Sequence, residues 1–447
     1  MRDLLNDASA RAYRYLASLD ERAVAPDPDA VARLSELDIP LPAGPSDPAE
    51  TLAELDRFAD ATMAMSGPRF FGFVTGGALP AALAANWLAG AWDQNTILSA
   101  VTPLTAHLET VATRWLVDLL GLPQGTAAGF VTGATMANFS CLVAARHAVL
   151  ARVGWDVEAD GLFGAPPVTV VVGGEAHSAL IKALGMAGFG RNRVVRAPVD
   201  DQGRIRPETF PALNGPTIVC LQAGNVNTGA FDPATELISL ARAAGAWTHV
   251  DGAFGLWAAA SPHYAALMEG YAAADSWATD GHKYLNTPYD SGLAFVRDPQ
   301  PLRAAMSVAA AYLPTGGAIE PMELTPEMSR RARGVEVWAA LRSLGRAGVA
   351  NLVEQSCRQA RRFAEGLRAA GYEILNDVVL NQALVSFGDD ARTQRVMAGI
   401  QREGTCWAGG TVWQGRAAMR ISVSSWRTTD ADVERSLAAM LRVASAV

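Results

Sequence analysis

Short apolar runs separated by helical stretches dominate the chain from Pro68 onward. Four of these runs are rich in β-branched residues, namely VTVVVGG at 168–174, PTIVCLQAG at 216–224, AWTHVDGAFG at 246–255 and SGLAFVRD at 291–298. Apolar runs of this length, with helical segments between them, are typical of parallel strands that are buried on both faces. The pattern therefore predicts a layered α/β domain built around a mostly parallel sheet.

The two ends of the chain have different patterns. Residues 1–60 are expected to form a helical arm, interrupted by a proline-rich connector. We place the large α/β domain at 61–344 and a smaller C-terminal α+β domain at 345–447, where EILN, NQALVSFG and AAMRISVSSW precede a helix with a Thr/Asp start. The polar segment 313–331, which contains Gly and Pro, is predicted to be a mobile loop.

Composition narrows the class of protein. The chain has 447 residues, 50% of them hydrophobic, and a formal net charge of −8, with its basic residues scattered. This describes a globular protein without a basic patch for nucleic acid or acidic lipid. No apolar stretch approaches the ~18 residues of a membrane span, and no targeting segment is apparent. Four widely spaced cysteines argue against a zinc site and an oxidising compartment, so we expect a cytoplasmic protein that acts on a small molecule.

Lysine is rare in this sequence. It occurs twice, as Lys182 and Lys283, whereas arginine supplies the other 35 of the 37 basic residues. Because a guanidinium does not deprotonate at physiological pH, chemistry that needs a neutral amine has only these two candidates. Lys283 follows His282 in a polar turn between predicted buried strands, where desolvation eases loss of its proton and imine formation with a carbonyl. The plain alternative is a surface lysine, and Lys182, inside a predicted helix, is interpreted as structural.

Asp251 is the second candidate. It ends the predicted strand WTHVD and is followed by GAFG. Ligands of parallel α/β sheets bind at the carboxyl ends of the strands, so a carboxylate there faces the binding crevice. Such a carboxylate can keep a pyridine nitrogen protonated, which makes the ring an electron sink. The alternative is an aspartate that caps the following turn.

Two further segments have the features of a binding site. GFVTGATMANFSCLVAARH at 129–147 predicts a strand, a turn and a helix, whose N-terminal amides and the hydroxyls of Thr132 and Thr135 can hold a phosphate. It has neither a P-loop ending nor GxGxxG, which disfavours a nucleotide. His177 lies where a strand ends and a helix begins, and its neutral imidazole can stack on a flat cofactor. For both segments an ordinary capped helix start is the alternative.

The order of these segments resembles that of the pyridoxal-phosphate-dependent group II amino-acid decarboxylases, which include aromatic-amino-acid and glutamate decarboxylases. The resemblance runs from 67–96 to 329–346, and weakly to the C-terminus. It implies the aspartate-aminotransferase-like fold, PLP fold type I, with pyridoxal 5'-phosphate as the cofactor. It also implies a homodimer with active sites at the interface, and a reaction that releases carbon dioxide from an L-amino acid through an external aldimine.

The resemblance assigns roles to individual positions. Lys283 corresponds to the lysine that binds the cofactor, Asp251 to the partner of the ring nitrogen, and His177 and Ala253 to the residues on the two ring faces. The phosphate side corresponds to Thr132, Gly133, Ala134, Thr135 and His282, with Asp280 as a possible outer contributor. Asn225 and Asn227 are the candidates near the ring hydroxyl, and which of them faces the ring is left open.

One position departs from the animal aromatic-amino-acid enzymes, which have a tyrosine in the mobile loop as proton donor. Alignment on SRRAR and Trp338 puts Pro321 at about that point, and 313–331 contains no tyrosine. Tyr312, Tyr284 or His177 could protonate Cα instead. Another reaction, such as carbon–carbon lysis, oxidative deamination or transamination, therefore remains an alternative to decarboxylation. A scaffold without catalysis is disfavoured, because it has no need of Lys283, Asp251 and His177 together.

The substrate pocket is expected to include Phe71 and Phe73 and, from the neighbouring subunit, residues near Asn95 and Ile97. Aromatic rings there suit an apolar or aromatic amino acid, although neighbouring phenylalanines are more often core residues. Arg69 and Arg420 are candidate partners for a carboxylate, with surface pairing as the alternative for each.

Overall fold

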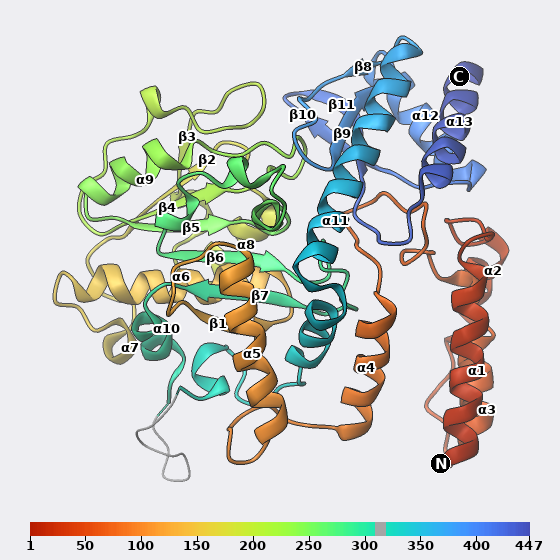
Figure 1. Ribbon diagram of the computed structural model, residues 1–447, viewed down its shortest axis with the longest axis horizontal. Coiled ribbons are helices and arrows are strands. Elements are labelled where there is room, and N and C mark those ends of the chain that lie inside the picture. The colour runs from red at the N-terminus through yellow and green to blue at the C-terminus, as the bar shows by residue number, and fades with distance from the viewer. Residues whose placement is uncertain (309–318) are drawn as a thin grey trace.

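The computed structural model describes residues 1–308 and 319–447 and, within them, a central sheet flanked by helices (Figure 1). The central sheet consists of β1 (Ala127–Val131), β2 (Thr169–Gly173), β3 (Val195–Ala197), β4 (Thr217–Gln222), β5 (Trp247–Asp251), β6 (Ser276–Asp280) and β7 (Gly292–Val296). Their spatial order is β1-β7-β6-β5-β4-β2-β3. Strand β7 runs antiparallel to both of its neighbours, and the other pairs are parallel. The predicted mostly parallel sheet is confirmed.

Helices cover both faces of this sheet, because alternate residues of each buried strand point to opposite sides. Val170 and Val172 of β2 belong to one hydrophobic core, and Val171 belongs to the other. The first core is closed by α6 (Ala134–Ala151), α7 (Val157–Asp160), α8 (Ser178–Met186) and α10 (Pro299–Met306). The second is closed by α4 (Pro80–Trp92), α5 (Pro103–Leu119), α9 (Ala234–Ala243) and the start of α11 (Gly334–Ala369).

The C-terminal part forms a second sheet with its own core. Strands β8 (Glu373–Ile374), β9 (Gln382–Ser386), β10 (Gly409–Trp413) and β11 (Arg416–Ser422) pair in the order β10-β11-β9-β8. Helices α12 (Asp390–Glu403) and α13 (Asp430–Ala446) pack on it together with the later turns of α11. The Thr/Asp start of α13 is a capping box on Thr429, as the sequence predicts. The expected boundary at 344–345 falls inside α11, where Gly345 has a non-helical φ of 59°.

The N-terminal residues form an arm of three helices beside α4 (Figure 1). These are α1 (Arg2–Ser18), α2 (Pro28–Ala32) and α3 (Pro48–Asp56), and Asp56 pairs with Arg11 and Arg14 of α1. Arg69 connects this arm to the C-terminal part, because its guanidinium donates to the carbonyl oxygens of Asp20 at 2.6 Å and Thr405 at 2.8 Å. Its side chain is 1% exposed, so Arg69 is a structural residue and does not meet a substrate carboxylate.

The structure describes part of the predicted mobile loop at 313–331. Residues 313–318 of the predicted mobile loop lie outside the described residues, as does Tyr312, and 319–331 contains a short 3-10 helix at Pro321–Leu324. In the described part of the chain, no helix combines the length and the apolar character needed to cross a membrane.

Candidate active site

The carboxyl ends of β4, β5 and β6 surround one cavity of about 190 Å³. Parallel strands end at the same edge of a sheet, which brings together residues that are distant in the sequence. Asp251 at the end of β5 and Lys283 in the turn after β6 both line this cavity, as the sequence predicts. The full lining is Phe73, Val74, His177, Gln222, Gly224, Val226, Asp251, Ala253, Phe254, Lys283 and Arg420.

Asp280 holds Lys283 close to the turn formed by residues 132–135. The ammonium Nζ lies 3.0 Å from Asp280 Oδ2, and the lysine side chain is only 16% exposed. Asp280 Oδ1 accepts a 2.6 Å hydrogen bond from the backbone N–H of Ala134, the first residue of α6. A carboxylate at a helix N-terminus is favoured by the helix dipole and the unpaired amides. Asp280 therefore fixes the predicted turn, Thr132 to Thr135, next to the amine.

His282 lies beside Asp280, next to Lys283 in the sequence. Its ring stacks on Tyr289 with the centroids 4.1 Å apart, and its Nδ1 accepts from the N–H of Ser291 at 3.3 Å. Burial lowers the pKa of His282, so at neutral pH the ring is uncharged with its proton on Nε2, which lies 3.6 Å from Asp280 Oδ1. A Cβ at Gly133 would be 3.2 Å from His282 Cε1, so the turn approaches this ring closely because it has no side chain there.

Asp251 is almost fully buried, with 5% of its surface exposed. Its Oδ1 accepts from the N–H of Ala253 and its Oδ2 from Nδ2 of Asn138, both at 3.3 Å. Burial raises the pKa of Asp251, whereas the nearby His177 and Lys283 lower it. Two hydrogen bonds leave part of the carboxylate available to a cationic group in the cavity.

His177 is the N-cap of α8 and faces the cavity. Its Nδ1 accepts from the N–H of Ala179 at 3.2 Å, and burial lowers its pKa. The neutral ring therefore carries its proton on Nε2. The sequence prediction of a neutral imidazole at this strand end agrees with this geometry.

Arg420 of β11 brings a cation to the cavity from the C-terminal sheet. It donates to the carbonyl oxygen of Val226 at 3.0 Å, and among the described residues it forms no ion pair. Burial lowers its pKa to about 10, so the guanidinium remains charged at neutral pH. A half-buried guanidinium that has no carboxylate partner among the described residues is suited to bind a carboxylate in bidentate geometry.

Several predicted site residues do not line this cavity, and Asn225, Asn227 and Phe71 are among them. Asn225 and Asn227 do not line it, because Asn225 Oδ1 closes its own turn by accepting from the N–H of Asn227 at 2.9 Å. Asn227 Oδ1 accepts from the hydroxyl of Thr411 at 3.0 Å, and the intervening Val226 faces the cavity instead. Phe71 lies in the C-terminal core, where its ring meets that of Phe363 edge to face at 4.9 Å. These three side chains stabilise the fold through hydrogen bonds and core packing.

Phe73, in contrast, lines the cavity and is 61% exposed. Of the proposed proton donors, Tyr284 is fully buried, and its hydroxyl contacts Sγ of Cys357 at 3.7 Å, away from the cavity. Tyr312 lies outside the described residues. His177 is therefore the candidate donor that the structure places at the site.

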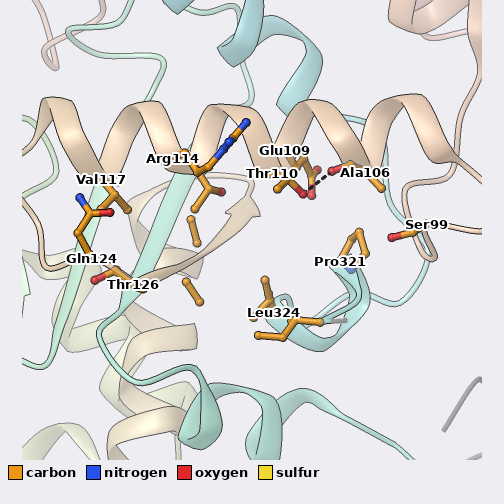
Figure 2. A pocket seen from close by; sticks show the side chains of 15 residues that line it. Ser99, Ala106, Glu109, Thr110, Arg114, Val117, Gln124, Thr126, Pro321 and Leu324 are labelled. Atoms are coloured by element: carbon orange, nitrogen blue, oxygen red, sulfur yellow. Dashed lines mark hydrogen bonds between the residues drawn. The ribbon is translucent and has the colours of Figure 1, made fainter. Parts of the chain in front are cut away.

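Asn95 and Ile97 lie elsewhere on the same chain. Asn95 Oδ1 accepts from the N–H of Arg330 at 2.9 Å, and the carbonyl oxygen of Ile97 accepts from Met322 at 3.2 Å. Close to them is a second cavity of about 410 Å³, between α5 and the segment that contains Pro321 and Leu324 (Figure 2). None of the predicted cofactor residues lines this second cavity.

The sequence interpretation missed several residues at the site. Gln222, Val226 and Phe254 line the cavity, and Asn138 and His249 lie behind Asp251. His249 had a usable signal, because it lies two residues before Asp251 on a strand and so shares its face. Val226 had none, since the conformation of the turn decides which of three consecutive side chains points inward.

The described residues fit the cofactor that the resemblance implies. Lys283 offers a desolvated amine, and Asp251 offers a buried carboxylate in the same cavity. On the phosphate side, Gly133 leaves room beside His282 at a helix N-terminus, where backbone amides attract an anion. The amine of Lys283 matches an aldehyde, the carboxylate of Asp251 matches a basic ring nitrogen, and the helix N-terminus at Gly133 matches a phosphate.

Comparisons with known proteins agree with the geometry. The family model described as "Pyridoxal-dependent decarboxylase conserved domain" matches residues 46–388. Tryptophan decarboxylase 1 of Oryza sativa subsp. japonica is 27% identical over 401 residues, which cover 80% of this chain and 77% of that protein. L-2,4-diaminobutyrate decarboxylase of Rhizobium meliloti is 28% identical over 432 residues, with 91% and 84% covered.

A solved structure shows the same fold. The crystal structure of Oryza sativa TDC with PLP and tryptamine superposes with a TM-score of 0.91 at 22% identity, and the match covers 100% of this chain and 97% of that one. The likeness extends over both sheets and the N-terminal arm, because the whole chain is covered. Since the family model matches most of the chain, the protein belongs to the pyridoxal-dependent decarboxylases, carboxy-lyases whose cofactor is pyridoxal 5'-phosphate.

Proposed function

We propose that this protein releases carbon dioxide from an L-amino acid with an aromatic or apolar side chain. The observation that carries the proposal is the convergence of Lys283, Asp251, His177 and Arg420 on one cavity. When bound, pyridoxal 5'-phosphate supplies a ring that withdraws electrons from the bond broken at Cα. The protein's own residues have to bind the substrate, orient that bond and handle one proton.

Arg420 orients the substrate through its carboxylate. The guanidinium is fixed by its bond to the carbonyl oxygen of Val226 and has no carboxylate partner among the described residues. Phe73 and Phe254 line the same cavity and give it apolar surfaces, which exclude water and favour an apolar side chain. This arrangement supports the substrate class.

Lys283, Asp251 and His177 control charge and protons. Asp280 Oδ2 keeps Lys283 Nζ at the cavity, where this amine would hold the aldehyde of the cofactor. The Asp251 carboxylate favours a protonated ring nitrogen. His177 holds its proton on Nε2, which faces the cavity and is the donor that we propose for Cα.

We also propose a homodimer. None of the 17 residues of α1 is buried, and an apolar groove of about 590 Å³ lies between the arm and α4. Leu55 and Trp87 line this groove and are 67% and 41% exposed. An apolar surface of this kind marks an interface, and a second copy also supplies the Asn95 and Ile97 region to the site. Sedimentation equilibrium tests this, and a monomer at micromolar concentration would reject it.

We propose that the protein acts in the cytoplasm. All four cysteines are buried and unpaired, which suits a reducing compartment.

The decisive experiment measures carbon dioxide release from a panel of L-amino acids, with the products identified by mass spectrometry. We expect release with aromatic or apolar substrates and formation of the corresponding amine. An aldehyde with ammonia as the main product would identify oxidative deamination, and keto acid without carbon dioxide would identify transamination. Either result would reject the proposal.

A further inference from the structure

Behind Asp251 lies a line of buried polar side chains that the proposed reaction does not use directly. Trp247, His249 and Asp251 alternate along β5 and so share one face of the strand. Ser276 on the neighbouring strand β6 is in register with His249, and Asn138 comes from α6, which packs on this face. All five residues are at most 5% exposed. A set of polar groups this deeply buried has to satisfy its hydrogen bonds internally.

The hydrogen bonds connect these side chains into one chain. Trp247 Nε1 donates to Ser276 Oγ at 2.9 Å, and Ser276 Oγ lies 3.0 Å from His249 Nδ1. His249 Nε2 lies 2.8 Å from Asn138 Oδ1, and Asn138 Nδ2 donates to Asp251 Oδ2 at 3.3 Å. This series of hydrogen bonds therefore starts at the indole N–H of Trp247, which can only donate, and ends at the carboxylate of Asp251, which can only accept.

This direction fixes the proton positions. Ser276 Oγ accepts from the indole N–H, and its single hydroxyl proton can be donated to His249 Nδ1 when that nitrogen carries no proton. Asn138 Oδ1 can only accept, so His249 Nε2 carries the ring proton. With the opposite amide orientation, Asn138 would place its oxygen against the Asp251 carboxylate. One neutral tautomer of His249 therefore satisfies every member of the chain.

The surroundings favour a neutral His249. Burial lowers the pKa of this ring to about 3, so it does not titrate near neutral pH. The titratable groups that act on Asp251 are His177 and Lys283 across the cavity and the thiols of Cys141 and Cys220 behind it. Burial raises the pKa of both thiols far above its usual value, so they stay neutral. On the side of Asp251 that faces away from the cavity, the carboxylate is therefore surrounded by neutral side chains, and the hydrogen-bonded series ends at its Oδ2.

We propose that Asn138 and His249 are positioning residues that hold the Asp251 carboxylate in one orientation toward the ring nitrogen of the bound cofactor. Apart from the N–H of Ala253, Asn138 Nδ2 is the donor that the described residues give to this carboxylate. His249 acts through Asn138, because its Nε2–H fixes the amide so that its nitrogen faces Asp251. Successive donors that point toward the carboxylate also favour its charged form. The inference rests on the family's cofactor and deepens the role proposed for Asp251.

The test compares four variants: Asn138→Leu, His249→Leu, His249→Gln and Thr248→Val. Leucine at 138 removes the donor to Asp251, and leucine at 249 releases the amide. Glutamine at 249 retains an N–H that can reach Asn138 Oδ1. Thr248 is buried on the opposite face of the same strand, so valine there is the matched control for packing.

The main measurement is the dissociation constant of pyridoxal 5'-phosphate, obtained by titrating cofactor-depleted protein and following absorbance. We expect affinity to fall at least tenfold in Asn138→Leu and His249→Leu, with most of it restored in His249→Gln and no change in Thr248→Val. The pH at which the cofactor absorbance changes should shift in the two leucine variants, and kcat should fall while KM stays within twofold. Affinity within twofold of the parent in Asn138→Leu, or equal losses in His249→Gln and His249→Leu, would overturn the proposal.

A second measurement covers the case in which a leucine variant fails to fold. The protein has 6 histidines, so nitrogen NMR of histidine-labelled, cofactor-depleted protein can be assigned with His249→Gln. We expect a neutral ring at His249 with its proton on Nε2 between pH 5 and 8. A proton on Nδ1, or a ring that titrates in this range, would overturn the proposal. A failed amino-acid panel combined with weakened cofactor binding in Asn138→Leu would reject the proposed substrate and still support this role.

Discussion

Replacing Arg420 with methionine should damage activity and leave the fold at least as stable. Burial lowers the pKa of Arg420 to about 10, which corresponds to a cost on the order of 3 kcal/mol for keeping the cation in the folded protein. Because this pKa is lower in the folded than in the unfolded chain, the cost is present in full at neutral pH and begins to fall only as the pH rises through about 10. Loss of the hydrogen bond to Val226 offsets about 1 kcal/mol of the gain.

The same substitution removes the group proposed to bind the substrate carboxylate. A hydrogen-bonded charge pair contributes roughly 1.5–3 kcal/mol, so kcat/KM should fall roughly 10- to 100-fold, mainly through KM. Urea unfolding of the cofactor-depleted protein and steady-state kinetics measure the two effects separately. The control is Arg416→Met on the same strand, because Arg416 is 48% exposed and pairs with Glu373 at the surface. An unchanged kcat/KM in Arg420→Met, or a loss of several kcal/mol of stability, would refute the reasoning.

Three further substitutions test other parts of the structure. Lys283→Ala should abolish carbon dioxide release and the borohydride-stable attachment of the cofactor while the thermal unfolding midpoint changes little, and residual turnover above 1% would contradict its role. Gly133→Val should weaken cofactor binding at least tenfold, measured by absorbance titration, because even the Cβ would be 3.2 Å from His282 Cε1. Glu109→Leu should lose about 3–5 kcal/mol in urea unfolding, because it leaves Arg330, which is 1% exposed, without the partner that it binds at 2.6 and 2.7 Å. Unfolding at the urea concentration of the parent protein would show that this ion pair is not needed.

The apolar pattern determined the central sheet. Strands β2, β4, β5 and β7 lie inside the four runs that the sequence predicts, because a strand buried on both faces needs a continuous apolar segment. Strand β10 was missed, because its burial alternates and it begins with two glycines, so no such segment marks it. The reversed direction of β7 was also not predictable, since a run of apolar residues does not indicate whether the strand is parallel or antiparallel to its neighbours.

The candidate site was predicted where a residue's position follows from the end of a strand. Asp251 and Lys283 face one cavity because β5 and β6 are parallel neighbours whose carboxyl ends coincide. Side-chain direction could not be predicted where it depends on the conformation of a turn. Asn225 and Asn227 point away from the cavity, and Val226 points into it.

By itself, the sequence determined the layered fold and the order of the chemical groups, because these depend on local periodicity and on which residue types occur. Tertiary structure alone decided that Arg420, 137 residues after Lys283, faces the same cavity and that Arg69 is buried as a connector. It also decided that His249, Asn138 and Ser276 form one hydrogen-bonded chain behind Asp251. Contacts between distant segments depend on how the layers pack, and no local pattern records that packing.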